Sequence, residues 1–256
     1  MATEQIFYQS AALVSSEKHR KTSVKTGENF SFASGANSVP LTAVEFGPAA
    51  ADYPIVFAGQ GDNVFPATVL GTQGEENLFV AEDGHWRGRY IPGYIRRYPF
   101  IFSTDAEQSR FTLLIDEAFE GVNSDDRGER LFDADGNQTQ YLKGVLRFLE
   151  DYQARFMRTQ AFCKRLVELD LLVPMQAQFT IRANEKRSLG GFMVVDRERL
   201  KGLKPDVLAD MMARDELECI FLHLSSLRHF RDMVEKAHSA EDDQPQEEPE
   251  TDEEAV

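Results

Sequence analysis

The residues best suited to chemistry lie between Trp86 and Phe100, in the stretch WRGRYIPGYIRRYPF. This segment carries four arginines and five aromatic rings but no acid, whereas the whole chain of 256 residues has a formal net charge of -15. A guanidinium group offers a planar fork of N–H donors to a carboxylate or phosphate, and aromatic faces stack on it. We therefore expect residues 86–100, called the arginine–tyrosine segment below, to recognise an anionic small molecule or a peptide.

Eight residues in and beside this segment are candidates for ligand binding. They are His85, Trp86, Arg87, Arg89, Tyr90, Tyr94, Arg96 and Arg97. Neighbours such as Arg96 and Arg97 point about 100° apart on a helix, so one regular helix rarely directs both at one ligand. One of the two is expected to bind the anion, while the other pairs with Asp116 or Glu117.

The competing interpretation is that these arginines serve the protein itself. They would then form internal ion pairs and stack on Tyr94 or Trp86. His85, which precedes Trp86 in a turn flanked by glycine, is the best histidine for acid–base work. The same position also fits a plain surface turn, so the sequence predicts no catalytic residue.

Two further patterns resemble metal sites, and we interpret both as structural. Residues 133–137 space oxygen-bearing side chains like a calcium loop, but glycine stands fourth instead of sixth and no glutamate stands twelfth. A turn that leads into a helix is therefore expected there. Cys219 and His223 lie four residues apart, a spacing compatible with a metal or a thiol–imidazole pair, but no third ligand follows. Core packing is the expectation for this pair. No metal ligand is predicted, and the cofactor stays unknown.

The arginine–tyrosine segment needs a framework, and the first half of the chain reads as short strands between turns. Strands are expected at 6–9, 54–58, 64–70, 78–81 and 111–115. A short helix is expected at 41–50, because Thr42 can cap it and Glu45 follows three residues later. Another is expected at 91–98, where Tyr90, Tyr94 and Tyr98 would share one face.

The second half has helical periodicity. Apolar residues recur at helical spacing through 139–172, which predicts one long amphipathic helix or two in sequence. A hairpin is expected next, with strands at 176–182 and 191–196. Helices are then expected at 196–203, 205–214 and 217–237.

The predicted fold class is α+β, with a β-rich N-terminal half packed on a helical C-terminal half that contains a short hairpin. We expect a single domain over 1–238 and a disordered acidic tail over 239–256, which holds nine acids and no base. The tail is expected to aid solubility. The alternative is a screen that competes for the arginine–tyrosine segment.

Composition also excludes some classes of function. A strongly acidic chain opposes the phosphate backbone, so no nucleic-acid partner is expected. No apolar run approaches the roughly 20 residues that span a bilayer. The first ten residues lack a basic stretch followed by an apolar one, and the chain has only two cysteines. A cytoplasmic location is therefore expected.

Four stretches carry a family resemblance. They are VPLTAVEFGPAAADYPIVF (39–57), GHWRGRYIPGYIRRYPF (84–100), RLFDADGNQTQYL (130–142) and LECIFLHLSSL (217–227). Through them the chain resembles the bacterial SapC family over nearly its whole length outside the tail. The resemblance implies an accessory role in the uptake or modification of a nutrient or peptide, linked to surface-layer or outer-membrane transport systems. It carries over no catalytic residue.

Three functions follow as hypotheses. The leading one is a cytoplasmic, non-enzymatic binding or accessory protein that recognises an anionic small molecule or peptide, and a partner protein is also open. The second is an enzyme or enzyme subunit that works with a halogenase- or oxygenase-type partner and uses His85. The third is a structural protein that dimerises through the long helix at 139–172, which leaves a homo-oligomer open.

Overall fold

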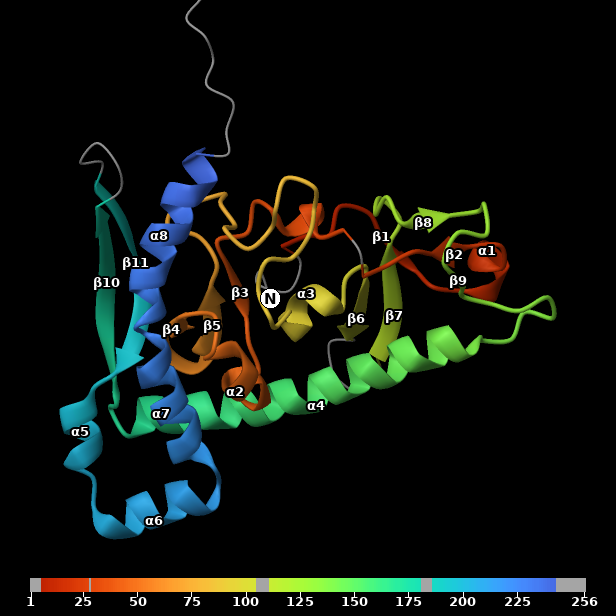
Figure 1. Ribbon diagram of the computed structural model, residues 1–256. Helices are drawn as coiled ribbons and strands as arrows, with labels where there is room; N and C mark the ends of the chain where they lie inside the picture. Colours follow the sequence, from red (N-terminus) through yellow and green to blue (C-terminus); the bar gives the residue numbers. More distant parts are fainter. Residues whose placement is uncertain (1–5, 28, 105–110, 181–185, 243–256) are drawn as a thin grey trace, which may run out of the picture.

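The computed structural model describes residues 6–27, 29–104, 111–180 and 186–242, and Figure 1 shows their arrangement. The strands are β1 (Ala11–Leu13), β2 (Ser23–Val24), β3 (Ser38–Pro40), β4 (Ile55–Ala58), β5 (Phe65–Val69), β6 (Phe100–Thr104), β7 (Phe111–Asp116), β8 (Val122–Asn123), β9 (Glu129–Arg130), β10 (Leu172–Thr180) and β11 (Lys186–Val195). The helices are α1 (Ser16–His19), α2 (Phe46–Ala49), α3 (Gly93–Arg96), α4 (Gln140–Glu168), α5 (Arg197–Lys201), α6 (Pro205–Ala213), α7 (Glu216–Ser226) and α8 (His229–Asp242). Sheets in the first half and helices in the second confirm the α+β expectation.

The strands form three antiparallel sheets. The largest has the order β10-β11-β4-β5-β3, and the two smaller ones have the orders β1-β7-β6 and β8-β2-β9. The large sheet joins both halves of the chain, because Phe192 and Met193 of β11 pair with Ala58 and Phe57 of β4. The C-terminal hairpin is therefore an extension of the N-terminal sheet.

Helix α4 runs beneath the sheets along the length of the molecule (Figure 1). Its N-cap is Thr139, whose Oγ1 accepts a hydrogen bond from the Leu142 amide at 3.3 Å. Its apolar stripe includes Leu142, Leu149, Phe162 and Leu166, all buried. The predicted long helix is therefore confirmed as one helix, and it ends at Glu168, before the expected boundary.

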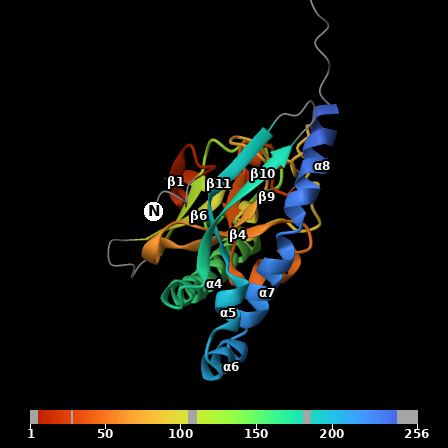
Figure 2. The same cartoon turned by 90° about the vertical axis from the view of Figure 1, so that its left-hand side faces the viewer.

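Helices α7 and α8 lie along the large sheet, as Figures 1 and 2 show. The sequence predicts one helix over 217–237, but the structure breaks it between Ser226 and His229. The Ser226 hydroxyl donates to the His223 carbonyl at 2.6 Å and accepts from the Ile55 amide at 2.9 Å. This contact with β4 occupies the last turn of α7. Helix α8 continues to Asp242, past the expected start of the tail at 239.

Several other elements also differ from those expected from the sequence. Residues 6–9 form turns and bends, and the first strand comes at Ala11–Leu13. Residues 78–81 contribute only an isolated bridge between Val80 and Trp86. The hairpin strands begin earlier than expected, at Leu172 and Lys186. Residues 181–185 and the tail from 243 onward lie outside the described residues. The short helix at 41–50 is a 3-10 turn at Ala43–Glu45 followed by α2.

Candidate functional site

The start of the arginine–tyrosine segment is folded tightly around the Tyr53 hydroxyl. This hydroxyl donates to the Tyr90 carbonyl, and the Trp86 indole donates to Tyr53 Oη at 2.9 Å and to the Tyr90 carbonyl at 3.0 Å. A Cβ built on Gly88 would lie 2.1 Å from Tyr53 Oη, so only glycine fits between the two rings. Trp86 also stacks on Phe79. Trp86 is thus a structural anchor that closes a turn.

The first two arginines and the histidine lie on the outside of this turn. Arg89 pairs with Asp52, with 2.8 Å between Nε and Oδ1, and its amide donates to the same carboxylate. Arg87 is exposed and lines a hollow of about 550 Å³ beside α8, together with Lys236. His85 is exposed and lies 3.2 Å from Asp83. His85 therefore lies in a surface turn, as the alternative interpretation of the sequence expected.

Tyr94 and Arg97 lie inside the protein. Their exposed fractions are 2% and 8%, and the Arg97 guanidinium carbon is 4.1 Å from the centre of the Tyr94 ring. The Arg97 guanidinium carbon also lies 5.2 Å from the centre of the Tyr152 ring on α4. Desolvated guanidinium–ring contacts of this kind stabilise a core. The stacking alternative therefore describes Arg97.

The acids expected to receive an arginine are held by other groups. The Asp116 carboxylate accepts from the Gln9 and Ser10 amides at 2.9 and 2.8 Å and from the Tyr98 hydroxyl at 3.1 Å. Glu117 pairs with Lys18 and His19. Lys18 and His19 hold the pKa of Glu117 below its ordinary value.

A buried carboxylate, Glu45, organises the middle of the segment. One of its oxygens accepts from the Thr42 amide and hydroxyl, which forms the predicted capping contact. The other accepts from the Tyr90 hydroxyl at 2.8 Å and from the Gly93 amide at 2.6 Å. Burial, with the Glu45 charge second, raises the pKa of Tyr90 to about 12. Helix α3 spans only Gly93–Arg96, so the expected shared tyrosine face does not form.

Arg96 is exposed, and its guanidinium lies against two aromatic rings. It lies over the rings of Tyr90 and Phe148, at 5.6 and 5.4 Å from their centres, and its Nε donates to the Ile91 carbonyl. It forms no ion pair with any carboxylate in the described ranges. The eight candidates are therefore divided: Arg87, Arg89 and His85 lie on the outside of the turn, and Trp86 anchors it. Arg97 and Tyr94 are internal, and Arg96 lies over Tyr90 beside α4.

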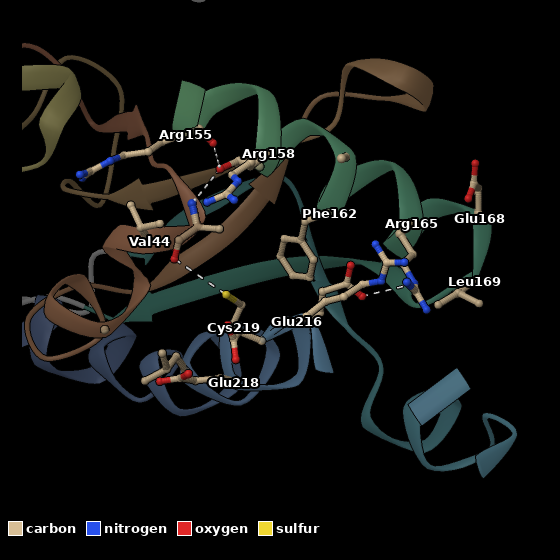
Figure 3. Close-up of a pocket in the computed structure, with 17 residues that line it drawn as sticks. Val44, Arg155, Arg158, Phe162, Arg165, Glu168, Leu169, Glu216, Glu218 and Cys219 are labelled. Atoms are coloured by element: carbon tan, nitrogen blue, oxygen red, sulfur yellow. Dashed lines mark hydrogen bonds and ion pairs between the residues drawn. The ribbon is translucent and has the colours of Figure 1, made fainter. Parts of the chain in front are cut away.

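A cleft of about 960 Å³ lies between α4, the start of α7 and residues 43–47 (Figure 3). Residues 43–47, called the 43–47 loop below, comprise the 3-10 turn and the start of α2. Charged side chains from α4 and α7 line it together with apolar ones. The lining residues are Ala43, Val44, Gly47, Arg155, Arg158, Thr159, Ala161, Phe162, Arg165, Glu168, Leu169, Arg214, Asp215, Glu216, Glu218, Cys219 and Leu222. The lining is both amphipathic and charged, which suits an organic ligand with ionic groups.

The backbone of Ala43 joins the walls of this cleft. Its amide donates to Thr159 Oγ1 on α4 at 2.9 Å, and its carbonyl accepts from Cys219 Sγ on α7 at 3.8 Å (Figure 3). The Thr159 hydroxyl in turn donates to the Arg155 carbonyl at 2.8 Å. Thr159 is 2% exposed, so one threonine in the middle of a helix fixes the loop at the mouth of the cleft.

The arginines of the cleft differ in what they contact. Arg165 is used internally, with contacts of 2.5 Å to Asp210 and 3.3 Å to Glu216. Burial raises the pKa of Glu216, and the Arg165 charge opposes that shift. Arg155 has one loose contact, 3.6 Å to Asp151. Arg158 is exposed and pairs with no acid in the described part of the chain.

Arg155 lies between the cleft and the arginine–tyrosine segment. This side chain lines the cleft and also a small hollow of about 40 Å³, whose other walls include Arg96 and Phe148 and the two acids Glu45 and Asp151. Arg96, Arg155 and Arg158 thus follow one another along the same side of α4. Arg155 and Arg158 are not among the residues predicted from sequence to bind a ligand, although their three-residue spacing places them on one helix face.

The remaining sequence motifs are structural. His223 is fully buried, with Nδ1 2.7 Å from the Ile55 carbonyl and Nε2 accepting from the Val195 amide at 3.0 Å. The Asp133 carboxylate accepts from the Asp135 and Asn137 amides inside its own turn. Within the described ranges, no group of three or more His, Cys, Asp or Glu residues is placed to hold a metal. None of the helices described there is long and apolar enough to cross a membrane.

Comparison with known proteins gives one match. No curated protein and no solved structure matches the chain. The SapC family matches residues 14–233, which include the arginine–tyrosine segment, all of α4 and all of α7. The match covers well over half of the 256 residues. The chain therefore belongs to the SapC family.

Proposed function

We propose that this SapC-family protein is a non-enzymatic binding protein that takes an anionic small molecule or a peptide into the cleft between α4 and α7. The observation that carries the proposal is the row formed by Arg96, Arg155 and Arg158. Arg96 and Arg158 have no acid partner among the described residues, although the chain carries 43 acids. A guanidinium group beside a cavity that forms no ion pair within the described part of the protein is suited to recognising a carboxylate or phosphate from outside.

The apolar part of the cleft supports an organic ligand over a bare ion. Phe162 and Leu222 line the cleft, and Val44 at its loop is 54% exposed. Covering such a side chain with apolar ligand surface is favourable by about 25 cal/mol per Å². A ligand with a carboxylate and an apolar body therefore fits better than inorganic phosphate.

The thiol at the cleft also favours binding over covalent catalysis. Burial raises the pKa of Cys219 to about 11, with Glu218 as the next cause in the same direction. A thiol with this pKa is protonated at neutral pH, whereas the thiolate is the nucleophile. An accessory role in nutrient uptake or surface transport is the finer proposal that the family resemblance adds.

The test is native mass spectrometry of the full chain purified from its own host. We expect a retained anionic compound in the unmodified protein. Arg158→Gln should weaken its binding about tenfold and so lower the retained fraction, because a charge-assisted hydrogen bond contributes about 1.5 kcal/mol. Arg147→Gln, on an exposed part of α4 outside the cleft, is the matched control and should retain the compound. Equal retention by both variants would overturn the proposal.

A further inference from the structure

Charges in the cleft are separated along its length. Arg155 and Arg158 lie at one end of the α4 wall and Glu168 at the other, as Figure 3 shows. On the α7 side, Asp215 and Glu216 begin the helix near the Glu168 end. The α4 wall therefore has Arg155 and Arg158 at one end and Glu168 at the other, with Phe162 between them, whereas Glu218 of the α7 wall lies beside Cys219 (Figure 3).

The cations near the acidic end are already used by the protein. Arg165 contacts Asp210 and Glu216, and Arg214 contacts Asp210 at 3.2 Å. The side chain of Glu168 is 62% exposed and has only a long contact of 3.9 Å with Lys164. Its carboxylate is thus accessible from the cleft. An anionic ligand would gain nothing at this end, whereas an ammonium group would gain a carboxylate partner.

The spacing of the two ends sets the length of a ligand that uses both. Arg158 and Glu168 are ten residues apart on α4, or about 15 Å at 1.5 Å per residue. An extended peptide advances about 3.3 Å per residue, so about five residues separate a terminal carboxylate from a terminal ammonium over this distance.

We propose that the ligand is a short peptide with free termini, bound in extended form along α4 with its terminal carboxylate at Arg155 and Arg158. Its terminal ammonium lies at Glu168, and its apolar side chains cover Leu222 and Val44. This inference rests on the proposed function and narrows it, because a fatty acid satisfies the arginines and the apolar floor but leaves the acidic end without a partner.

The experiment measures binding of a pentapeptide of Ala, Leu and Phe to the full chain by isothermal titration calorimetry. Three forms are compared: both termini free, N-terminus acetylated, and C-terminus amidated. We expect the free form to bind best and each blocked form to bind about tenfold more weakly, as for loss of one charge-assisted contact. Glu168→Gln should remove the effect of acetylation, and Arg158→Gln the effect of amidation. Glu150→Gln, exposed on α4 outside the cleft, is the control for loss of an acid.

Each outcome decides between the two proposals. If the acetylated peptide binds as well as the free one, the acidic end has no role and the inference fails, while the anion-binding proposal stands. If no form of the peptide binds but decanoate does, with a loss in Arg158→Gln, the same conclusion holds. If amidation and Arg158→Gln both leave peptide binding unchanged, the proposed function itself fails.

Discussion

Gly88 and His223 are single residues whose surroundings leave them little freedom. Gly88 sits where Tyr53 and Trp86 approach each other, and a side chain there has no space. His223 joins the backbones of β4 and β11 through its two ring nitrogens. Neither role follows from residue type alone, because each depends on a partner far away in the sequence.

The Gly88→Ala substitution should destabilise the protein. The new Cβ would lie 2.1 Å from Tyr53 Oη and 2.8 Å from Trp86 Nε1, so the turn must shift. Overpacking of this kind costs about 1–3 kcal/mol, measurable as a lower urea midpoint. Gly144→Ala is the control, since nothing lies within 4 Å of a Cβ there and the residue is inside α4. It should stabilise by about 0.5–1 kcal/mol. An equal response to both changes would contradict this packing account.

His223 should make stability depend on pH on the acid side. Burial lowers its pKa from 6.5 to about 4 in the folded protein. The unfolded state therefore binds the proton first, and stability present above pH 6.5 is lost as the pH falls toward 4. The difference amounts to about 3 kcal/mol for this group. Urea titrations from pH 7.5 to 4 should show the loss. It should shrink in His223→Gln, and an unchanged slope in that variant would refute the assignment.

At the scale of elements, the cleft depends on how α4 holds the 43–47 loop. Thr159→Val removes the hydroxyl that receives the Ala43 amide while keeping the branched shape. We expect the free energy of unfolding to fall by about 1–3 kcal/mol, because the Ala43 amide is left without its hydrogen-bond acceptor. Ligand binding should weaken as well. Thr159→Ser keeps the hydroxyl and should restore most of both, as measured by thermal unfolding and calorimetry. Failure of serine to restore them would point to the methyl group instead.

The elements differ in how well the sequence predicts them, because some depend on contacts between sequence neighbours and others on contacts between residues far apart in the chain. Helix α4 and the contact between Thr42 and Glu45 are predictable, because each depends on neighbours within a turn or two. The break after Ser226 is not, since apolar spacing continues across it and the cause is a hydrogen bond to Ile55. The strand expected at 6–9 fails for a similar reason: the Gln9 amide binds Asp116 instead of a neighbouring strand.

The candidate site shows the same limit. The sequence points to the arginine–tyrosine segment by composition, but only the fold separates Arg97, which is buried, from Arg96, which is exposed. The cleft is assembled from three segments that are more than 100 residues apart at the extremes. Arg158 looks like any exposed helix residue until α7 and the 43–47 loop are placed against it.

For the whole molecule, net charge should oppose an anionic ligand at long range. Removing residues 243–256 deletes seven acids and no base, which changes the formal net charge from -15 to -8. Weaker repulsion should raise the association rate for decanoate at about 10 mM salt, and the difference should vanish near 0.5 M salt, where screening is short-ranged. Stopped-flow measurements on both chains test this. A faster rate that persists at high salt would indicate direct competition by the tail.

The backbone of Ala43, which is hydrogen-bonded to α4 and α7, can report on whether the cleft is occupied. Its N–H is protected from solvent only while Thr159 holds it, and that hydrogen bond breaks whenever the loop parts from α4. A ligand that contacts both walls is expected to slow this local opening. The rate of deuterium uptake at the Ala43 amide would therefore rank ligands by occupancy, even before any of them is identified chemically.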